Sequence, residues 1–110
     1  MAKLKCDDVT NEFIKNHIYK NKIVIFGLSS CELTENLNKI FKEEYKHTSK
    51  IIYVDKLEVN DISMNSLKDC VLLKTKDLVL PKTYVNGMYL GGYKAVREIH
   101  FRKDLDVMLL

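Results

Sequence analysis

The chain has 110 residues, 46% of them hydrophobic and 30% charged, with a formal net charge of +3. This length suits one compact core and is too short for a second, so we expect a single domain over residues 1–110. The composition excludes a disordered chain, and the absence of any block of like charges argues against nucleic acid as a partner. The first residues lack the apolar core of a secretory signal and the longest apolar run is too short to span a bilayer, so we expect a cytoplasmic protein without membrane contact. We also expect it to be a monomer.

The first elements follow from helical spacing and then from a continuous apolar run. Apolar residues recur at helical intervals from Val9 to Ile18, which predicts a helix over residues 8–20. The run Ile23-Val24-Ile25-Phe26 is β-branched and aromatic, which is typical of a strand buried on both faces. We therefore expect a central strand to follow the first helix.

A loop over residues 27–30 leads into a second helix, which begins near Cys31. Ser30 is the expected N-cap, because serine is a favourable capping residue. The apolar stripe of this helix consists of Leu33, Leu37, Ile40, Phe41 and Tyr45. Residues 51–54 form the next run of the buried type and predict a second strand.

The remaining elements are a third helix, a hairpin and a last helix. Apolar residues three and four apart predict the third helix over roughly residues 60–73. Two short runs are separated by Asn86-Gly87, a strong hairpin signal because a type I′ turn needs positive φ at both central residues. The last helix is expected over residues 93–109.

This order of elements predicts an α/β fold. A strand, a crossover helix and a second strand in succession indicate a parallel pair, and the hairpin adds antiparallel strands. We therefore expect a four-stranded mixed β-sheet flanked by helices on both faces.

Cysteine usage gives the first indication of chemistry. Cys6, Cys31 and Cys70 are odd in number and far apart, which argues against a disulfide framework and suits a reducing compartment. Cys70 lies on an apolar helical stripe and Cys6 near the start of the chain, so both are interpreted as packing residues. Whether either one pairs with Cys31 stays open. The cysteines and histidines have no spacing typical of a metal site.

Cys31 differs from the other two because it lies between a buried strand and the start of a helix. Free backbone N–H groups and the helix dipole at such a position favour a thiolate over a thiol. Against this, an isolated cysteine often behaves as a small buried hydrophobic residue. Cys31 is therefore the candidate nucleophile, and its neighbours in the fold decide between the two interpretations.

Those neighbours resemble a known family. With Ile23 to Phe26 leading to Cys31, a proline at Leu80-Pro81 and the segment Asn86 to Gly92, the chain resembles a glutaredoxin of the thioredoxin fold over nearly its full length. The resemblance implies that Leu80-Pro81 is cis. It also implies that the ligand groove is lined by Leu80, Pro81, Gly91, Gly92 and Tyr93.

Three departures limit what the resemblance implies. Thr34 occupies the place of the second cysteine of a dithiol glutaredoxin, so the site is of the monothiol type, and the Thr34 hydroxyl is expected to donate a hydrogen bond to the Cys31 sulfur. Leu28 stands where the family usually has a lysine that supports the thiolate and contacts glutathione. Lys94-Ala95 replaces an acidic pair that holds the ligand's amino group, and either Lys94 or Arg97 can replace the positive charge that is lost at Leu28.

The resemblance implies a thiol–disulfide oxidoreductase of weak or selective activity in cell redox homeostasis, with glutathione as cosubstrate. Its partners would be glutathione or protein disulfide and mixed-disulfide substrates, with Cys31 as nucleophile. A non-catalytic thioredoxin-fold binding module is one alternative, which Leu28 and Lys94 favour. A glutathione-dependent [2Fe–2S] cluster carrier is another, and it is the less favoured because the cluster would need the same glutathione contacts.

Overall fold

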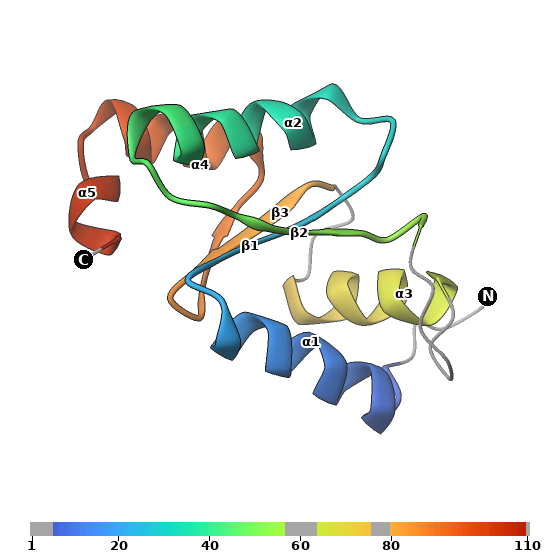
Figure 1. Cartoon of the computed structure of the whole chain (residues 1–110). Coiled ribbons are helices and arrows are strands. Elements are labelled where there is room, and N and C mark those ends of the chain that lie inside the picture. The colour runs from blue at the N-terminus through green and yellow to red at the C-terminus, as the bar shows by residue number, and fades with distance from the viewer. Residues whose placement is uncertain (1–5, 57–63, 76–79, 110) are drawn as a thin grey trace.

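The computed structural model describes residues 6–56, 64–75 and 80–109 and shows one sheet between two layers of helices (Figure 1). The strands are β1 (Ile23–Gly27), β2 (Lys50–Tyr53), β3 (Lys82–Val85) and β4 (Met88–Gly91). The helices are α1 (Asp8–Lys20), α2 (Glu32–Lys39), the π-helix η1 (Ile40–Glu44), α3 (Met64–Thr75), α4 (Tyr93–Phe101) and α5 (Leu105–Met108). The predicted α/β fold with a four-stranded mixed sheet is confirmed.

The strands lie in the order β2-β1-β3-β4, so β1 is central as predicted. β1 pairs with β2 in parallel, while β3 is antiparallel to both β1 and β4. The parallel pair follows from the helical crossover between β1 and β2, and the antiparallel pair β3-β4 from the tight turn. In that turn Asn86 and Gly87 have φ values of 51° and 83°, which confirms the predicted hairpin.

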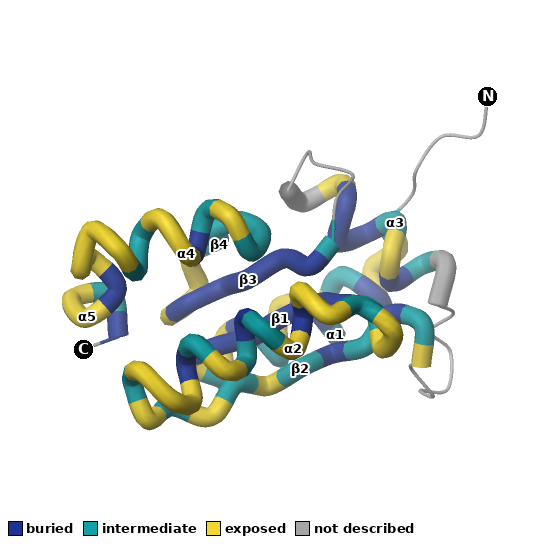
Figure 2. The backbone as a smooth tube through the Cα atoms, turned by 90° about the horizontal axis from the view of Figure 1, so that it is seen from above, coloured by how far each residue is buried: buried dark blue, intermediate teal, exposed yellow. Residues whose placement is uncertain are grey.

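Alternate residues of β1 enter two different cores. Val24 and Phe26 pack in the core beneath α1 and α3, whereas Ile23 and Ile25 pack in the core beneath α2, α4 and α5. Figure 1 shows these two helical layers on opposite faces of the sheet. Figure 2 shows that β3 is buried along its whole length. The continuous apolar run of β1 is therefore explained by burial on both faces.

Two expectations about the second helix are wrong. The N-cap of α2 is Cys31 rather than Ser30, so the helix begins one residue later than a serine cap would place it. Leu33 was assigned to the apolar stripe, but its side chain is 42% exposed. The stripe is correct at Leu37 and Phe41, and beyond Lys39 the chain widens into η1.

The last helix is shorter than predicted. α4 ends at Phe101, and Lys103 has a φ of 63°, a left-handed conformation that stops a helix. The chain then turns back into α5, which buries Leu105 and Leu109 in the second core. Helical spacing does not record this reversal, because both segments keep an apolar face. The expected start of the third helix at residue 60 lies outside the described residues.

Cys6 and Cys70 are joined by a disulfide, with Cα atoms 4.4 Å apart. The expectation of no disulfide is wrong, because 64 residues of sequence separation place no limit on distance in space. Cys6 directly precedes the cap of α1, and Cys70 lies in α3, which packs beside α1 on the same face of the sheet. Among the three cysteines, Cys31 is the free one.

Candidate thiol site at the end of the first strand

The candidate site lies at one edge of the sheet, where three strands meet. Phe26 of β1 pairs with Lys82 of β3, and Thr83 of β3 pairs with Gly91 of β4. The end of β1, the start of β3 and the end of β4 are therefore neighbours, on the right in Figure 1. The loops that carry Cys31, Pro81 and Gly92 all leave the sheet at this edge.

Cys31 is held at the start of α2 by backbone hydrogen bonds. Its N–H donates to the carbonyl of Leu28 over 3.1 Å, and its carbonyl accepts from the N–H of Thr34 over 3.2 Å. The side chain is half-buried and makes no capping hydrogen bond. A thiol at an N-cap lies close to the free N–H groups of the first helical turn, which suits a nucleophilic sulfur.

The loop before Cys31 is fixed by a carboxylate that sequence reasoning missed. Asp55 accepts hydrogen bonds from the backbone N–H of Ser29 over 2.9 Å and from its hydroxyl over 2.6 Å. The hydroxyl bond, followed by the N–H bond, lowers the pKa of Asp55 below its usual value. Ser29 and Asp55 are 26 residues apart in the sequence. The one signal that could have found Asp55 is its position directly after the predicted strand at residues 51–54, which places it at this edge of the sheet.

Thr34 faces the sheet rather than the thiol. Its side chain is fully buried, and its Oγ1 has no hydrogen-bond partner among the described residues. A Cβ added to Gly27 would lie 2.3 Å from that oxygen, so the hydroxyl is packed against the end of β1. The expected hydrogen bond to the Cys31 sulfur is therefore not formed in this structure. The close packing also means that only glycine at position 27 leaves room for the Thr34 side chain.

A cavity of about 580 Å³ lies beside the start of α4. The peptide Leu80-Pro81 is cis, which confirms that prediction. Gly92 approaches Pro81 so closely that a Cβ at position 92 would lie 3.2 Å from the Pro81 carbonyl oxygen. The residues that line the cavity are Leu33, Leu80, Pro81, Gly92, Tyr93, Lys94, Ala95 and Arg97.

Five of the predicted ligand-binding residues thus meet at one cavity, while two do not line it. Gly91 adopts a φ of 115° at the end of β4, where a Cβ would meet that of Ala95 at 2.8 Å. Leu28 is half-buried and packs against the first core, as Leu80 also does. Leu33 lines the cavity without having been predicted, because its apolar side chain carried no signal that distinguishes a groove from a core, and Ala95 lines it at a place where the resemblance expects an acidic residue.

The charged side chains that line the cavity are both positive and both come from α4. Lys94 and Arg97 are exposed, and no ion pair joins either of them to a carboxylate among the described residues. The guanidinium of Arg97 lies 5.1 Å from the ring centre of Phe101. On α2, Glu32 is exposed, and Glu35 accepts a hydrogen bond from the Tyr53 hydroxyl over 2.6 Å.

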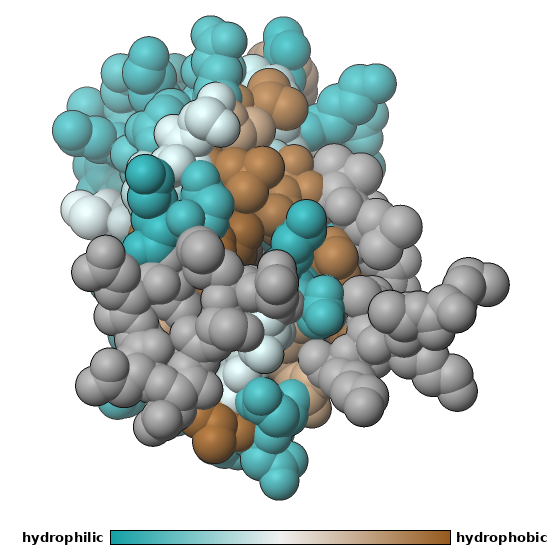
Figure 3. All heavy atoms as spheres, turned by 90° about the vertical axis from the view of Figure 1, so that its right-hand side faces the viewer, coloured by the Kyte–Doolittle hydropathy of each residue, from teal (hydrophilic) through white to brown (hydrophobic). Residues whose placement is uncertain are grey.

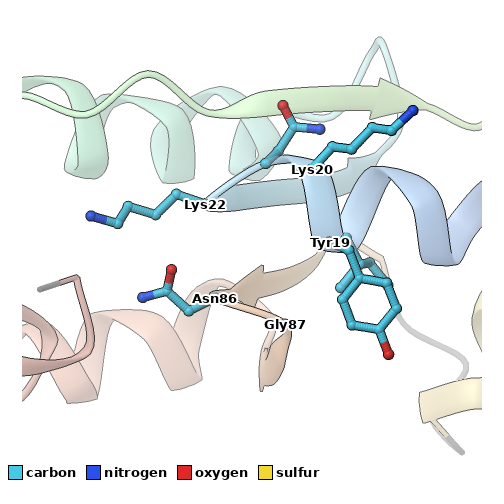
Figure 4. Close-up of a pocket in the computed structure, with 7 residues that line it drawn as sticks. Tyr19, Lys20, Lys22, Asn86 and Gly87 are labelled. Carbon is cyan, nitrogen blue, oxygen red and sulfur yellow. The ribbon is translucent and has the colours of Figure 1, made fainter.

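A smaller hollow of about 220 Å³ lies at the opposite end of the sheet, around the β3-β4 turn. Figure 4 shows that the side chains of Lys20 and Lys22 extend in opposite directions there and that Tyr19 turns away from both. Its polar groups do not converge on one point. The described residues contain no group of three or more side chains suited to hold a metal ion, and no described helix is long and apolar enough to cross a membrane.

The curated proteins that are similar to this chain in sequence are glutaredoxins. The chain is 29% identical to monothiol glutaredoxin-S6 of Oryza sativa over 97 residues, which cover 88% of this chain and 70% of that protein. It is 28% identical to human mitochondrial glutaredoxin-2 over 79% of this chain, and it spans only about half the length of that relative. It is 24% identical to probable monothiol glutaredoxin 2 of Rickettsia prowazekii over 89% of each chain. No family model matches the sequence.

Solved structures give the same fold. The structure of a buckwheat glutaredoxin-glutathione complex superposes with a TM-score of 0.81 at 20% identity, covering 92% of this chain and 87% of that one. Glutaredoxin C1 of Populus tremula x tremuloides superposes with a TM-score of 0.79 at 20% identity, covering 93% and 96%. The chain is thus similar in sequence to curated glutaredoxins and has the fold of solved glutaredoxins, with Cys31, the cis peptide before β3 and the Gly91-Gly92 segment at one edge of the sheet.

Proposed function

We propose that the protein is a monothiol thiol–disulfide oxidoreductase linked to glutathione, with Cys31 as its nucleophile. The observation that carries this proposal is the free, half-buried thiol at the N-cap of α2, at the same sheet edge as Leu80, Pro81 and Gly92. The buckwheat structure is a complex with glutathione, which supports glutathione as the cosubstrate here. The cytoplasmic location and the monomeric state stay predictions.

The chemistry is a pair of disulfide exchanges. The Cys31 thiolate attacks the glutathione sulfur of a mixed disulfide, forms a new S–S bond and releases the substrate as a thiolate, which takes up a proton from water. A second glutathione thiolate then attacks the Cys31 mixed disulfide, restores Cys31 and leaves as oxidised glutathione. An external thiol is needed for this step because Thr34 stands in the place of a second thiol and Cys6 and Cys70 are bonded to each other.

The residues around the cavity would divide the remaining tasks. Leu80 and Pro81 would offer backbone to a ligand in the cavity, and Gly92 lies so close to Pro81 that a side chain there would crowd the Pro81 carbonyl. Tyr93 begins α4, where the first free N–H groups can hold a carboxylate. Lys94 adds a positive charge for an anionic ligand.

The test is glutathione-linked reduction of a small mixed disulfide, coupled to glutathione reductase. We expect steady turnover by the wild-type protein and none by Cys31→Ser. The double variant Cys6→Ser/Cys70→Ser serves as the control, because it removes the two cysteines that are bonded to each other, exposes no new thiol and is expected to keep the activity. Turnover that survives Cys31→Ser would contradict the proposal.

A non-catalytic binding module remains the second candidate function. It is favoured by Leu28, which removes a positive charge near the thiol, and by Leu33, which exposes apolar surface beside the cavity. In that case the protein would bind its partner equally well with serine at position 31. A binding assay with Cys31→Ser therefore separates the two functions.

A further inference from the structure

The cavity at the start of α4 does not include Cys31 in its lining but is lined by Leu33, two residues after it, and has an apolar floor that glutathione would leave unused. Leu33, Leu80 and Ala95 provide this floor, and Leu33 remains 42% exposed although it is two residues from the thiol. Figure 3 views this edge of the sheet and shows hydrophobic surface near the middle of the face, with hydrophilic surface to its left and above it. The volume of about 580 Å³ lies within the range of clefts that enclose a ligand of several groups.

The rim of the cavity carries unpaired positive charge on one side. Lys94 and Arg97 are three residues apart on α4, so their side chains project from the same face of the helix. Glu98 lies four residues after Lys94, yet neither cation forms an ion pair with a carboxylate among the described residues. The acidic residue closest in sequence to Cys31 is Glu32 on α2, which does not line the cavity.

The apolar floor and the cationic rim together favour a substrate that carries both an apolar group and a negative charge. A polypeptide can place an apolar side chain on Leu33 and Leu80 while a carboxylate contacts Lys94, whereas glutathione has carboxylates and no apolar side chain. A basic segment would be repelled by the same rim. Charge complementarity of this kind acts mainly on the association rate and on the choice of partner.

We propose that the cavity receives a cysteine-bearing protein segment with an apolar residue next to its cysteine and a carboxylate one or two residues further on. This inference rests on the proposed function, since Cys31 is the attacking group. The Cys31 thiolate attacks the cysteine sulfur of a disulfide in that segment, an S–S bond forms between them, and the original partner sulfur leaves as a thiolate. Electrons balance because one disulfide replaces another.

The test uses short peptides whose single cysteine is activated as a mixed disulfide with 2-thiopyridine, an uncharged leaving group. Attack by Cys31 releases pyridine-2-thione, whose absorbance gives the rate, and mass spectrometry identifies the Cys31–peptide adduct. The peptides place leucine before the cysteine and either glutamate or lysine after it, and a further peptide replaces the leucine with serine. A neutral hydroxyethyl mixed disulfide measures the reactivity of Cys31 alone.

We expect the leucine–glutamate peptide to react about threefold to fivefold faster than the leucine–lysine peptide at low salt, the size of effect that exposed charge pairs give. High salt should remove this difference. Lys94→Glu should abolish or reverse it, whereas Lys15→Glu makes the same charge change on exposed α1 surface and should keep it. The serine peptide should be slower than its leucine counterpart.

Two failures are distinguishable. If the hydroxyethyl disulfide reacts at Cys31 but all peptides react at equal rates, the substrate preference is overturned and the proposed function is unaffected. If Cys31 does not react even with the hydroxyethyl disulfide, the proposed function itself fails, and the preference with it. If Lys94→Glu and Arg97→Glu both leave the preference for the glutamate peptide unchanged, the proposal that these two cations contact the substrate carboxylate is also overturned.

Discussion

The carboxylate of Asp55 binds Ser29 through two hydrogen bonds, 2.9 Å from the backbone N–H and 2.6 Å from the hydroxyl. Ser29 lies two residues before Cys31, so this pair connects the loop that precedes the thiol to the chain that follows β2. The N–H of Val54 donates to the carbonyl of Gly27 in the same region, over 2.9 Å. The position of Cys31 thus depends on a contact between the loops after two parallel strands.

The Asp55–Ser29 pair predicts a pH dependence. Because the hydroxyl bond lowers the pKa of Asp55 from 3.8 in the folded protein, its stabilisation is fully present above pH 3.8 and is lost as the pH falls through the folded value. We expect NMR titration of the Asp55 carboxyl to give a midpoint below 3.8 and Ser29→Ala to raise it. Ser30→Ala is the control and should change nothing. A wild-type midpoint at or above 3.8 would contradict the pair.

Tyr84 predicts a loss of stability in alkali. Its side chain is 8% exposed and lies edge to face with Phe26, and burial raises the pKa of Tyr84 from 10.0 to about 12. Between these values the unfolded chain loses the proton while the folded chain keeps it, so the free energy of unfolding falls as the pH rises above 10, by up to about 2–3 kcal/mol. Urea unfolding at about pH 9 and about pH 11 should show about 1.3 kcal/mol of this loss, because the full amount is reached only above the folded pKa.

The control for this prediction is a pair of tyrosine substitutions. Tyr84→Phe removes the titrating group and should flatten the pH dependence above 10. Tyr19→Phe changes a side chain that is 78% exposed and should leave the dependence as it is in the wild type. A slope that persists in Tyr84→Phe would show that another group causes it.

The disulfide between Cys6 and Cys70 predicts that oxidised protein has one free thiol, Cys31. In oxidising buffer we expect Cys6→Ser to lower the free energy of unfolding by about 2–4 kcal/mol, because the disulfide closes a loop with a sequence separation of 64 residues. In dithiothreitol the difference should shrink strongly. Thiol counting by alkylation under denaturing conditions checks the pairing, and three free thiols in oxidised protein would contradict it.

Local sequence patterns predicted the strands, the hairpin and the helix start, because these features depend on residues that are neighbours in the sequence. The run Ile23 to Phe26 indicated a central strand because burial on both faces requires apolar side chains at every position. Asn86-Gly87 indicated the hairpin because few residue pairs accept positive φ twice in succession. Cys31 was placed at a helix start for the same reason, since strand, loop and helix follow one another along the chain.

Contacts between distant residues could not be predicted in the same way. The disulfide and the Ser29–Asp55 pair join residues that only the packing of different elements brings together. Leu33 fits a helical stripe, yet the stripe at that turn faces an open cavity rather than the core. Lys103 interrupts the last helix because burying Leu105 requires the chain to turn back, and no local pattern indicates that requirement.

Cluster reconstitution tests the less favoured alternative. Protein treated with iron, sulfide and glutathione should stay nearly colourless. Leu28 and Lys94 replace the charged residues that the family resemblance expects around glutathione, so glutathione should be held too loosely to serve as a cluster ligand. The measurement is the visible absorbance of the reconstituted protein. A dimer with strong visible absorbance would contradict this expectation. Absorbance that disappears in Cys31→Ser would place the cluster at this thiol.

Leu28→Lys restores the charge that the resemblance expects three residues before Cys31. A lysine there should favour the Cys31 thiolate and offer an ion pair to a carboxylate of glutathione. We therefore expect faster alkylation of Cys31 at neutral pH and faster reduction of a glutathione mixed disulfide, where a tenfold gain corresponds to about 1.4 kcal/mol of transition-state stabilisation.

This substitution also affects the core, because Leu28 is half-buried and packs against the cluster that contains Phe26. A loss of about 1–2 kcal/mol in the free energy of unfolding is expected from the apolar contact removed. Leu28→Met keeps an apolar side chain of similar volume and is the matched control, so it should leave the rates unchanged. If Leu28→Lys speeds alkylation while glutathione-linked turnover stays undetectable, the cavity is not built for glutathione. The binding-module function then becomes the better account of the site, since a reactive thiol without its cosubstrate leaves the apolar floor and the cations of α4 as the features that recognise a partner.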